Sequence, residues 1–188
     1  MIKKILIIGS TGKLGKLLLN YCKKNNISIE AIASYKNYKL QIKQQSVLNV
    51  KHGFCLSKNE EKLKFKKFIK SRNFKIVYFL DYGAMSLKYL NAIINNNSNT
   101  QLCIANKEMI IAGGKLLIDK INKSGNKLVP LDSEHFSMVN SNINNNEIDK
   151  VFITASGGPF YFKKTVNMNK VSLKQVLKHP KWDMGKNN

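Results

Sequence analysis

Short apolar runs alternate with amphipathic stretches along the first two thirds of the chain. Residues 2–8 are rich in β-branched side chains and end at Gly9, a pattern typical of a buried parallel strand. Similar runs predict strands at residues 27–34, 75–80, 101–105 and 127–131. The intervening stretches predict helices near residues 60–71, 85–95 and 109–123. This alternation predicts right-handed crossovers and a doubly wound α/β domain, whose parallel sheet is covered on both faces.

The first predicted helix directly follows the first strand and carries a periodic apolar stripe. Its members recur at helical spacing and are Leu14, Leu17, Leu18, Tyr21 and Cys22. We expect this stripe to pack against the sheet.

The alternation breaks in the polar stretch 140–149. After it, residues 150–154 predict one more strand and residues near 172–178 one more helix. This last segment is too small to hold a core of its own. We therefore expect the domain change to lie between about residue 131 and residue 150.

A glycine-rich turn, Gly9-Ser-Thr-Gly12-Lys-Leu-Gly15, joins the first strand to the first helix. Glycines in this position permit a tight turn and a close approach of backbone to a dinucleotide pyrophosphate, whose charge the helix N-terminus meets. The alternative is a glycine-rich turn that binds no ligand. The order of strand, turn, amphipathic helix and strand favours the dinucleotide site.

The choice of nicotinamide cofactor depends on the end of the second strand, which reads Ser34-Tyr-Lys-Asn37. An NAD site usually carries a carboxylate here for the ribose 2′-hydroxyl, and such a carboxylate would repel a 2′-phosphate. Lys36 would attract that phosphate, so the sequence favours NADPH. Alternatively, Lys36 is one more solvated lysine in a lysine-rich chain.

Two further motifs follow the later strands. Asn106-Lys-Glu108 stands where ligands bind in open α/β sheets, and a lysine there can hold a phosphate or polarise a carbonyl. In Pro130-Leu-Asp-Ser-Glu-His135, two carboxylates at i and i+2 on extended chain would point the same way and supply oxygen ligands to Mg²⁺ or Mn²⁺. Alternatively, Ser133 is a helix N-cap, and Asp132 and Glu134 only favour the helix dipole.

The last segment contains two more candidates. Thr154-Ala-Ser-Gly-Gly-Pro-Phe160 presents backbone N–H groups beside a hydroxyl, which is typical of a phosphate nest. His179-Pro-Lys-Trp-Asp-Met-Gly185 groups an imidazole, the only tryptophan and a methionine in one short loop.

Composition narrows the function classes. The net charge of +21 suggests nucleic acid, but only Arg72 of the 32 basic residues is arginine, and the lysines are scattered among asparagine runs. A coding bias towards Lys, Asn and Ile explains the charge without a selected basic face. Three cysteines without a metal-ligand or redox spacing indicate a reducing compartment, with the cytoplasm as the default. No apolar run is long enough for a membrane span.

Together, the glycine turn and the motifs at residues 105–108, 130–135, 154–160 and 179–185 resemble the 1-deoxy-D-xylulose 5-phosphate reductoisomerase family. The resemblance implies skeletal rearrangement and NADPH reduction of a sugar phosphate to 2-C-methyl-D-erythritol 4-phosphate. It also implies Mg²⁺ or Mn²⁺, with Co²⁺ as a further option, and a homodimer for the complete enzyme. Residues 1–131 would then be a Rossmann-like NADPH-binding domain, and residues 132–188 the incomplete start of an α+β catalytic domain.

The resemblance assigns roles residue by residue. Lys107, Glu134 and His179 would be catalytic, and Asp132 and Glu134 would bind the metal. Substrate contacts would come from Lys107, Ser133, Glu134, Ser156, His179, Trp182 and Met184. Cofactor contacts would come from Thr11, Gly12, Lys13, Leu14, Tyr35, Lys36, Asn37, Asn106, Glu108 and Gly185.

Two departures from the family pattern stand out. The chain stops at Lys186-Asn-Asn188, before the segment in which the family has a third metal carboxylate, and Asp81-Tyr-Gly-Ala-Met85 lacks the expected glycine and small-residue pattern. We therefore expect this chain to be an inactive fragment. The alternatives are another NADPH-dependent oxidoreductase domain and a basic nucleic-acid-binding module.

Overall fold

The computed structural model describes residues 4–141, 147–154, 157–162 and 167–178. The chain divides into two compact units, Met1–Asn142 and Ile143–Asn188. Each unit is described here by itself.

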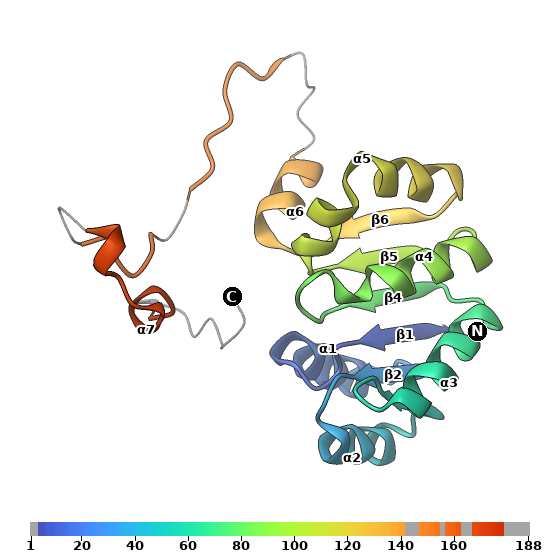
Figure 1. Ribbon diagram of the computed structural model, residues 1–188. Coiled ribbons are helices and arrows are strands. Elements are labelled where there is room, and N and C mark those ends of the chain that lie inside the picture. Colours follow the sequence, from blue (N-terminus) through green and yellow to red (C-terminus); the bar gives the residue numbers. More distant parts are fainter. Residues whose placement is uncertain (1–3, 142–146, 155–156, 163–166, 179–188) are drawn as a thin grey trace. The chain divides into compact units, whose positions relative to one another are not determined.

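A six-stranded sheet forms the centre of the first unit (Figure 1). Its strands are β1 (Ile5–Ile8), β2 (Ala31–Ser34), β3 (His52–Cys55), β4 (Ile76–Phe79), β5 (Gln101–Ile104) and β6 (Lys127–Pro130). They lie in the order β3-β2-β1-β4-β5-β6, and every neighbouring pair is parallel. This is the strand order of a doubly wound dinucleotide-binding fold, so the predicted fold class is confirmed.

Helices cover both faces of the sheet. The first unit contains α1 (Lys13–Lys24), α2 (Tyr38–Leu48), α3 (Asn59–Lys70), the 3₁₀ turn η1 (Ala84–Ser86), α4 (Leu87–Asn96), α5 (Lys107–Lys123) and α6 (Ser133–Asn140). Buried residues of α3, α4 and α5 pack on one face, and those of α1 pack on the other, where α2 also lies against β2 and β3.

Alternation along β1 separates the two cores. Leu6 and Ile8 pack beneath α3, α4 and α5, whereas Ile5 and Ile7 pack towards α1. Successive strand residues point to opposite faces, so four consecutive apolar residues serve both cores. This explains why the run reads as continuously apolar.

The predicted buried face of α1 is wrong in part. Leu14, Leu17 and Tyr21 are 49%, 58% and 57% exposed, and the buried residues are Gly15, Leu19 and Cys22. The cause lies at Gly15, where an added Cβ would come within 2.3 Å of the Gly9 carbonyl oxygen. Because only glycine permits this approach, the helix turns the Gly15 side towards the sheet.

The sequence pattern misses α2 and β3 and overextends β2. The predicted strand at residues 150–154 is also wrong, because the described residues there form no strand. Phe152 and Ile153 are 85% and 72% exposed, and the described part of this unit offers them no neighbouring strand. The unit does contain the 3₁₀ turn η3 (Met168–Lys170) and the short helix α7 (Leu173–Val176), which begins at a Ser172–Gln175 capping box.

The three cysteines are buried and free. In the described part of the chain, no helix is both long and apolar enough to cross a bilayer.

Candidate functional site

The carboxyl ends of all six parallel strands lie at one edge of the sheet, because parallel strands run the same way. The direction of strand connection reverses between β1 and β4, and ligands of open α/β sheets bind beside such a reversal. The glycine turn follows β1, residues 35–37 follow β2, and the two charged motifs follow β5 and β6. The fold therefore gathers the sequence motifs of the first unit at one edge.

The glycine turn adopts the backbone that its composition requires. Gly9 has a φ of +90°, and an added Cβ would lie 2.5 Å from the Asp81 amide nitrogen. The Gly9 amide donates to Ala33 O at 2.9 Å, and the Gly12 amide donates to Gly9 O at 3.1 Å. These bonds anchor the turn over the ends of β1 and β2.

The N-terminus of α1 is open to an anion. Gly12 is its N-cap and offers no side-chain acceptor, and the first turn contains no acidic residue. Gly12, Lys13 and Leu14 are exposed, and Thr11 is partly exposed. By contrast, α2, α5 and α6 have N-caps whose own side chains accept a backbone hydrogen bond. Among these helices, α1 is the one suited to a pyrophosphate.

Residues 35–37 form an exposed turn beyond β2. Lys36 Nζ lies 5.5 Å from the centroid of the Tyr35 ring. Asn37 caps α2 by accepting a hydrogen bond from the Leu40 amide at 3.2 Å. A turn with one cation and no carboxylate suits a ribose 2′-phosphate better than a free 2′-hydroxyl.

Asn106 is buried and holds two loops together. Its Oδ1 accepts from the Met109 amide at 3.3 Å and so caps α5, while its Nδ2 donates to Gly83 O at 2.6 Å. Glu108, two residues on, is exposed. Asn106 therefore ties the start of α5 to the loop after β4.

Lys107 and Glu134 face each other across the site. Lys107 is the first residue of α5, and its Nζ lies 3.8 Å from Glu134 Oε2; each side chain is 48% exposed. The Ser133 hydroxyl donates to the same Glu134 oxygen at 3.0 Å. The Glu134 backbone amide, the Ser133 hydroxyl and the Lys107 charge all lower the pKa of the Glu134 carboxyl. Glu134 is thus held as a carboxylate at neutral pH.

A helix, α6, starts directly after Asp132, so the prediction of extended chain from Asp132 to Glu134 is wrong. Asp132 is the N-cap, and Ser133 and Glu134 are already helical. Asp132 accepts from the His135 amide at 3.4 Å, and its Oδ1 lies 2.8 Å from His135 Nδ1. The alternative with Ser133 as the cap is also wrong. The helix nevertheless keeps both carboxylates in its first turn.

Two residues of the site had no role in the sequence analysis. His135 contacts the Asp132 carboxylate, and the i, i+3 spacing of the two residues at a helix start was the signal available. Asp81 follows β4 and is largely buried; Ser86 Oγ donates to its Oδ2 at 2.5 Å, while Oδ1 has no hydrogen-bond partner among the described residues. Burial raises the pKa of Asp81.

The remaining assignments lie outside the described residues. They are Ser156, His179, Trp182, Met184 and Gly185. Within the described part, no cluster of three or more His, Cys, Asp or Glu side chains suits a metal. Asp132 and Glu134 supply two carboxylates, and their oxygens are the ligands that Mg²⁺ and Mn²⁺ prefer. The two residues therefore fit part of a metal shell.

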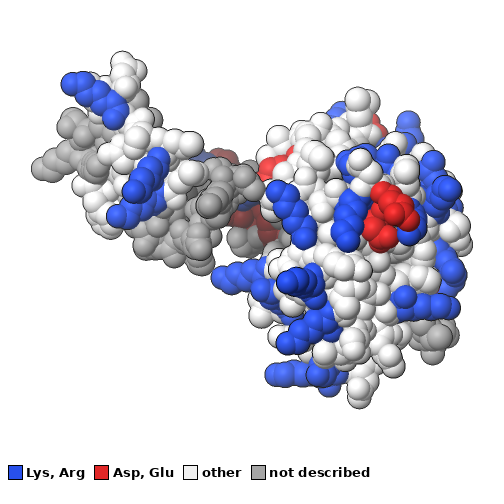
Figure 2. All heavy atoms as spheres, turned by 60° about the horizontal axis from the view of Figure 1, so that its bottom comes forward, with Lys and Arg blue, Asp and Glu red and all other residues white. Residues whose placement is uncertain are grey.

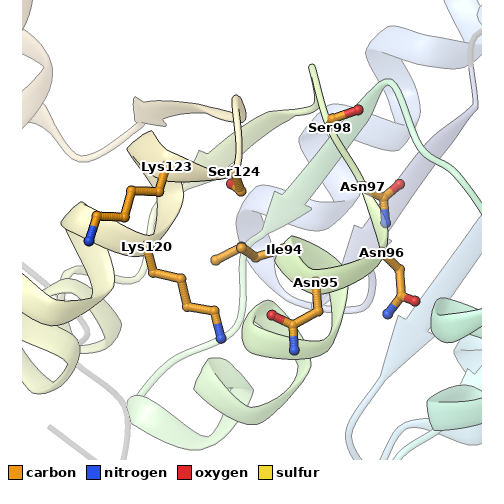
Figure 3. A pocket seen from close by; sticks show the side chains of 8 residues that line it. All are labelled: Ile94, Asn95, Asn96, Asn97, Ser98, Lys120, Lys123 and Ser124. Carbon is orange, nitrogen blue, oxygen red and sulfur yellow. The ribbon is translucent and has the colours of Figure 1, made fainter.

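A surface hollow of about 540 Å³ lies elsewhere in the unit, at the C-terminal ends of α4 and α5 (Figure 3). Asn95, Asn96, Lys120 and Lys123 are among its lining residues. Helix C-termini carry partial negative charge, so this hollow lacks the anion-binding chemistry of the glycine turn. In Figure 2, lysine and arginine side chains are spread over the visible face of the larger unit with uncharged surface between them.

Comparison with known proteins agrees with this arrangement. The family model described as the 1-deoxy-D-xylulose 5-phosphate reductoisomerase C-terminal domain matches residues 128–188. The 1-deoxy-D-xylulose 5-phosphate reductoisomerase of Pelagibacter ubique (strain HTCC1062) is 35% identical over 98% of this chain and 53% of its own length. The chain thus spans about half the length of the curated relatives it matches.

Solved structures of the same name share the fold. The 1-deoxy-D-xylulose 5-phosphate reductoisomerase from Zymomonas mobilis in complex with NADPH has a TM-score of 0.75 and 22% identity, covering 93% of this chain and 51% of that one. A reductoisomerase in complex with NADPH, fosmidomycin and magnesium also has a TM-score of 0.75, with 21% identity, covering 97% and 52%. Across 98% of its own residues, the chain is therefore a homologue of the 1-deoxy-D-xylulose 5-phosphate reductoisomerases.

Proposed function

We propose that this chain supplies the NADPH site and part of the metal and substrate site of a 1-deoxy-D-xylulose 5-phosphate reductoisomerase. The overall reaction rearranges the sugar-phosphate skeleton and transfers a hydride from NADPH, with one proton, to give 2-C-methyl-D-erythritol 4-phosphate and NADP⁺. The observation that carries the proposal is the Lys107–Glu134 pair beside Asp132. This group stands at the same sheet edge as an uncapped, glycine-started helix.

The cofactor would extend along this edge. Thr11, Gly12, Lys13 and Leu14 would hold its pyrophosphate through backbone N–H groups. Tyr35, Lys36 and Asn37 would meet the adenosine end, where the positive turn favours NADPH. Asn106 and Glu108 would stand at the nicotinamide side, because their loop follows β5, beyond the reversal of strand connection.

Asp132 and Glu134 would hold a Mg²⁺ or Mn²⁺ ion, or Co²⁺, and such an ion stabilises oxyanion charge that develops in the rearrangement. Lys107 would bind the substrate and orient it through its half-exposed ammonium group. The Ser133 hydroxyl would hydrogen-bond the substrate. From the unplaced segment, Ser156 and His179 would add substrate contacts, Trp182 and Met184 would exclude water, and Gly185 would approach the cofactor.

We further propose residues 1–131 as the cofactor domain and residues 132–188 as the start of the catalytic domain. A sugar phosphate, rather than a nucleic acid or a membrane, would be the partner, and the whole enzyme would be a cytoplasmic homodimer. We propose that this chain alone does not turn over, because its described residues bring only two carboxylates to the metal shell.

Fluorescence titration of the chain with NADPH and NADH tests this function. We expect NADPH to bind more tightly, and Lys36→Glu to weaken NADPH more than NADH. Lys43→Glu is the matched control, because Lys43 is an exposed lysine on α2 outside the turn. A folded chain that binds neither cofactor would contradict the proposal. Metal-dependent oxidation of NADPH with the sugar phosphate would show that the chain is active alone.

A further inference from the structure

The loop after β3 runs directly beside the turn after β2. The Leu56 amide donates to Ser34 O and the Ser57 amide donates to Tyr35 O, each at 2.8 Å. The β2–β3 pairing therefore continues past the ends of both strands. It places Lys58, the next residue, alongside the turn that contains Lys36.

Lys58 is held against the first residue of α2. Its Nζ lies 3.8 Å from the centroid of the Tyr38 ring, closer than Lys36 Nζ lies to the Tyr35 ring at 5.5 Å. A cation over an aromatic face is attracted by the negative charge of the ring face. The contact thus limits where the Lys58 ammonium can lie, whereas most surface lysines sample many rotamers.

Lys58 is not held by a strong ion pair among the described residues, and its charge only adds to the lowering of the Glu60 pKa, after Lys64. Lys58 is the N-cap of α3, but its side chain makes no cap hydrogen bond. The two acidic residues in the first turn of α3, Glu60 and Glu61, pair with Lys64 at 2.7 and 3.3 Å. No ion pair joins Lys58 to a carboxylate in the described part of the chain.

We propose that Lys58 is a second specificity-determining cation for NADPH, meeting the ribose 2′-phosphate from the loop after β3, while Lys36 meets it from the turn after β2. This inference rests on the proposed function, since it names a residue of the same cofactor site. The 2′-phosphate is the group that separates NADPH from NADH, and it is doubly charged near neutral pH. Cations from two adjoining loops attract it more strongly than one does, whereas a neutral hydroxyl gains little from either.

The Tyr38 ring is the second part of the proposed 2′-phosphate site. It supports the Lys58 ammonium group and leaves its charge intact, whereas a carboxylate would neutralise that charge. Tyr38→Phe keeps the ring face and should leave cofactor preference unchanged. Tyr38→Leu removes it and should lower the affinity for NADP⁺ while leaving that for NAD⁺ in place.

The test is calorimetric titration of NADP⁺ and NAD⁺ into the whole chain and its Lys58→Gln, Lys58→Arg and Lys43→Gln variants. Loss of one charge-assisted contact at an exposed site should weaken NADP⁺ binding by about threefold to tenfold. NAD⁺ binding should change by under about twofold, as should both affinities in the Lys43→Gln control. Lys58→Arg retains the charge and should retain the preference. Thermal midpoints confirm that each variant is folded.

Each outcome decides the matter. Selective loss of NADP⁺ affinity in Lys58→Gln, restored in Lys58→Arg, supports the inference. Unchanged NADP⁺ affinity in Lys58→Gln overturns the inference but leaves the proposed function standing. An equal loss of affinity for both cofactors also overturns the inference, because it would show that Lys58 has a structural role. A folded wild-type chain that binds neither dinucleotide overturns the proposed function and this inference with it.

Discussion

At the residue scale, a buried glutamine connects α2 to the glycine turn. Gln44 Nε2 donates to Ser10 O at 2.9 Å across 34 residues of sequence, and Gln41 accepts from the Ser34 hydroxyl at 2.8 Å. Both glutamines are buried, at 8% and 1% exposure. Buried polar groups are costly unless they are paired, so these two bonds fix how α2 docks against the ends of β1 and β2.

Gln44→Met preserves side-chain length but removes the donor. It should leave the Ser10 carbonyl without this partner and lower the free energy of unfolding by about 1–3 kcal/mol. Because the change acts on the glycine turn, NADPH and NADH affinity should fall by similar factors. Denaturant unfolding and paired titrations measure both effects. A loss confined to NADPH would contradict this reading.

Asp81 should make stability depend on pH. Burial raises the pKa of Asp81 and a nearby Glu108 charge raises it further, while the Ser86 hydroxyl opposes the shift. With a folded-state pKa above the unfolded value, the stabilising contribution of Asp81 is fully present below the unfolded pKa and is lost as pH rises through the folded pKa.

Asp81→Asn cannot ionise, so it removes this pH dependence. Wild-type stability, relative to the variant, should increase as pH falls from neutral towards the ordinary pKa of an aspartate carboxyl, because the raised folded-state pKa lets Asp81 take up its proton first in the folded state. Thermal melts of both proteins across that range give the difference. Parallel curves would show that Asp81 does not titrate there.

At the scale of elements, the N-terminus of α6 combines a cap with two proposed metal ligands. Asparagine caps helices as well as aspartate does, so Asp132→Asn should change the thermal midpoint little. It removes a charged oxygen ligand, and Mn²⁺ affinity should fall roughly tenfold or more. Loss of the free Mn²⁺ signal in electron paramagnetic resonance measures binding. Asp119→Asn, a charge loss on the exposed side of α5, is the matched control.

Unchanged Mn²⁺ binding in Asp132→Asn would leave Asp132 as a cap alone. The Asp132 cap was beyond the sequence pattern, which left open either extended chain from Asp132 to Glu134 or a helix capped by Ser133. The helix start at Ser133 depends on the fit of the Asp132 side chain to the His135 amide. The presence of two carboxylates at i and i+2 in the sequence does not predict this hydrogen bond.

Elements with strong apolar periodicity were predictable, and polar ones were not. β1, β4 and β5 are short buried runs that read directly from sequence. The buried residues of α2 are glutamines, so its inward face looks solvated in the sequence. β3 contains histidine and glycine, and the Gln45 side chain lies 2.2 Å from the place where a Cβ on Gly53 would be, so it packs over this glycine. In both cases a tertiary contact decides the structure.

At the scale of the whole first unit, the convergence of motifs was predictable because it follows from topology. Once β1, β4, β5 and β6 are parallel neighbours, the segments after them must meet at one edge. The contacts inside that edge were not predictable, since Lys107–Glu134 and Asn106–Gly83 depend on side-chain placement between loops distant in sequence. The role of Lys58 likewise depends on the continued pairing of β2 and β3 beyond their ends.

The two outer strands of the sheet also bear on self-association. The backbone amides of Lys127 and Leu131 donate hydrogen bonds towards β5. Backbone amides alternate in direction along a strand, so the backbone nitrogens of Leu128 and Pro130 point away from the sheet at its β6 border. Proline has no N–H, which leaves Leu128 as the one outward donor within this four-residue strand. β3 at the opposite border is equally short and follows Lys51. Short borders with proline and lysine are poor templates for cross-β growth, so a sheet this apolar is protected against fibrillar stacking of neighbouring copies.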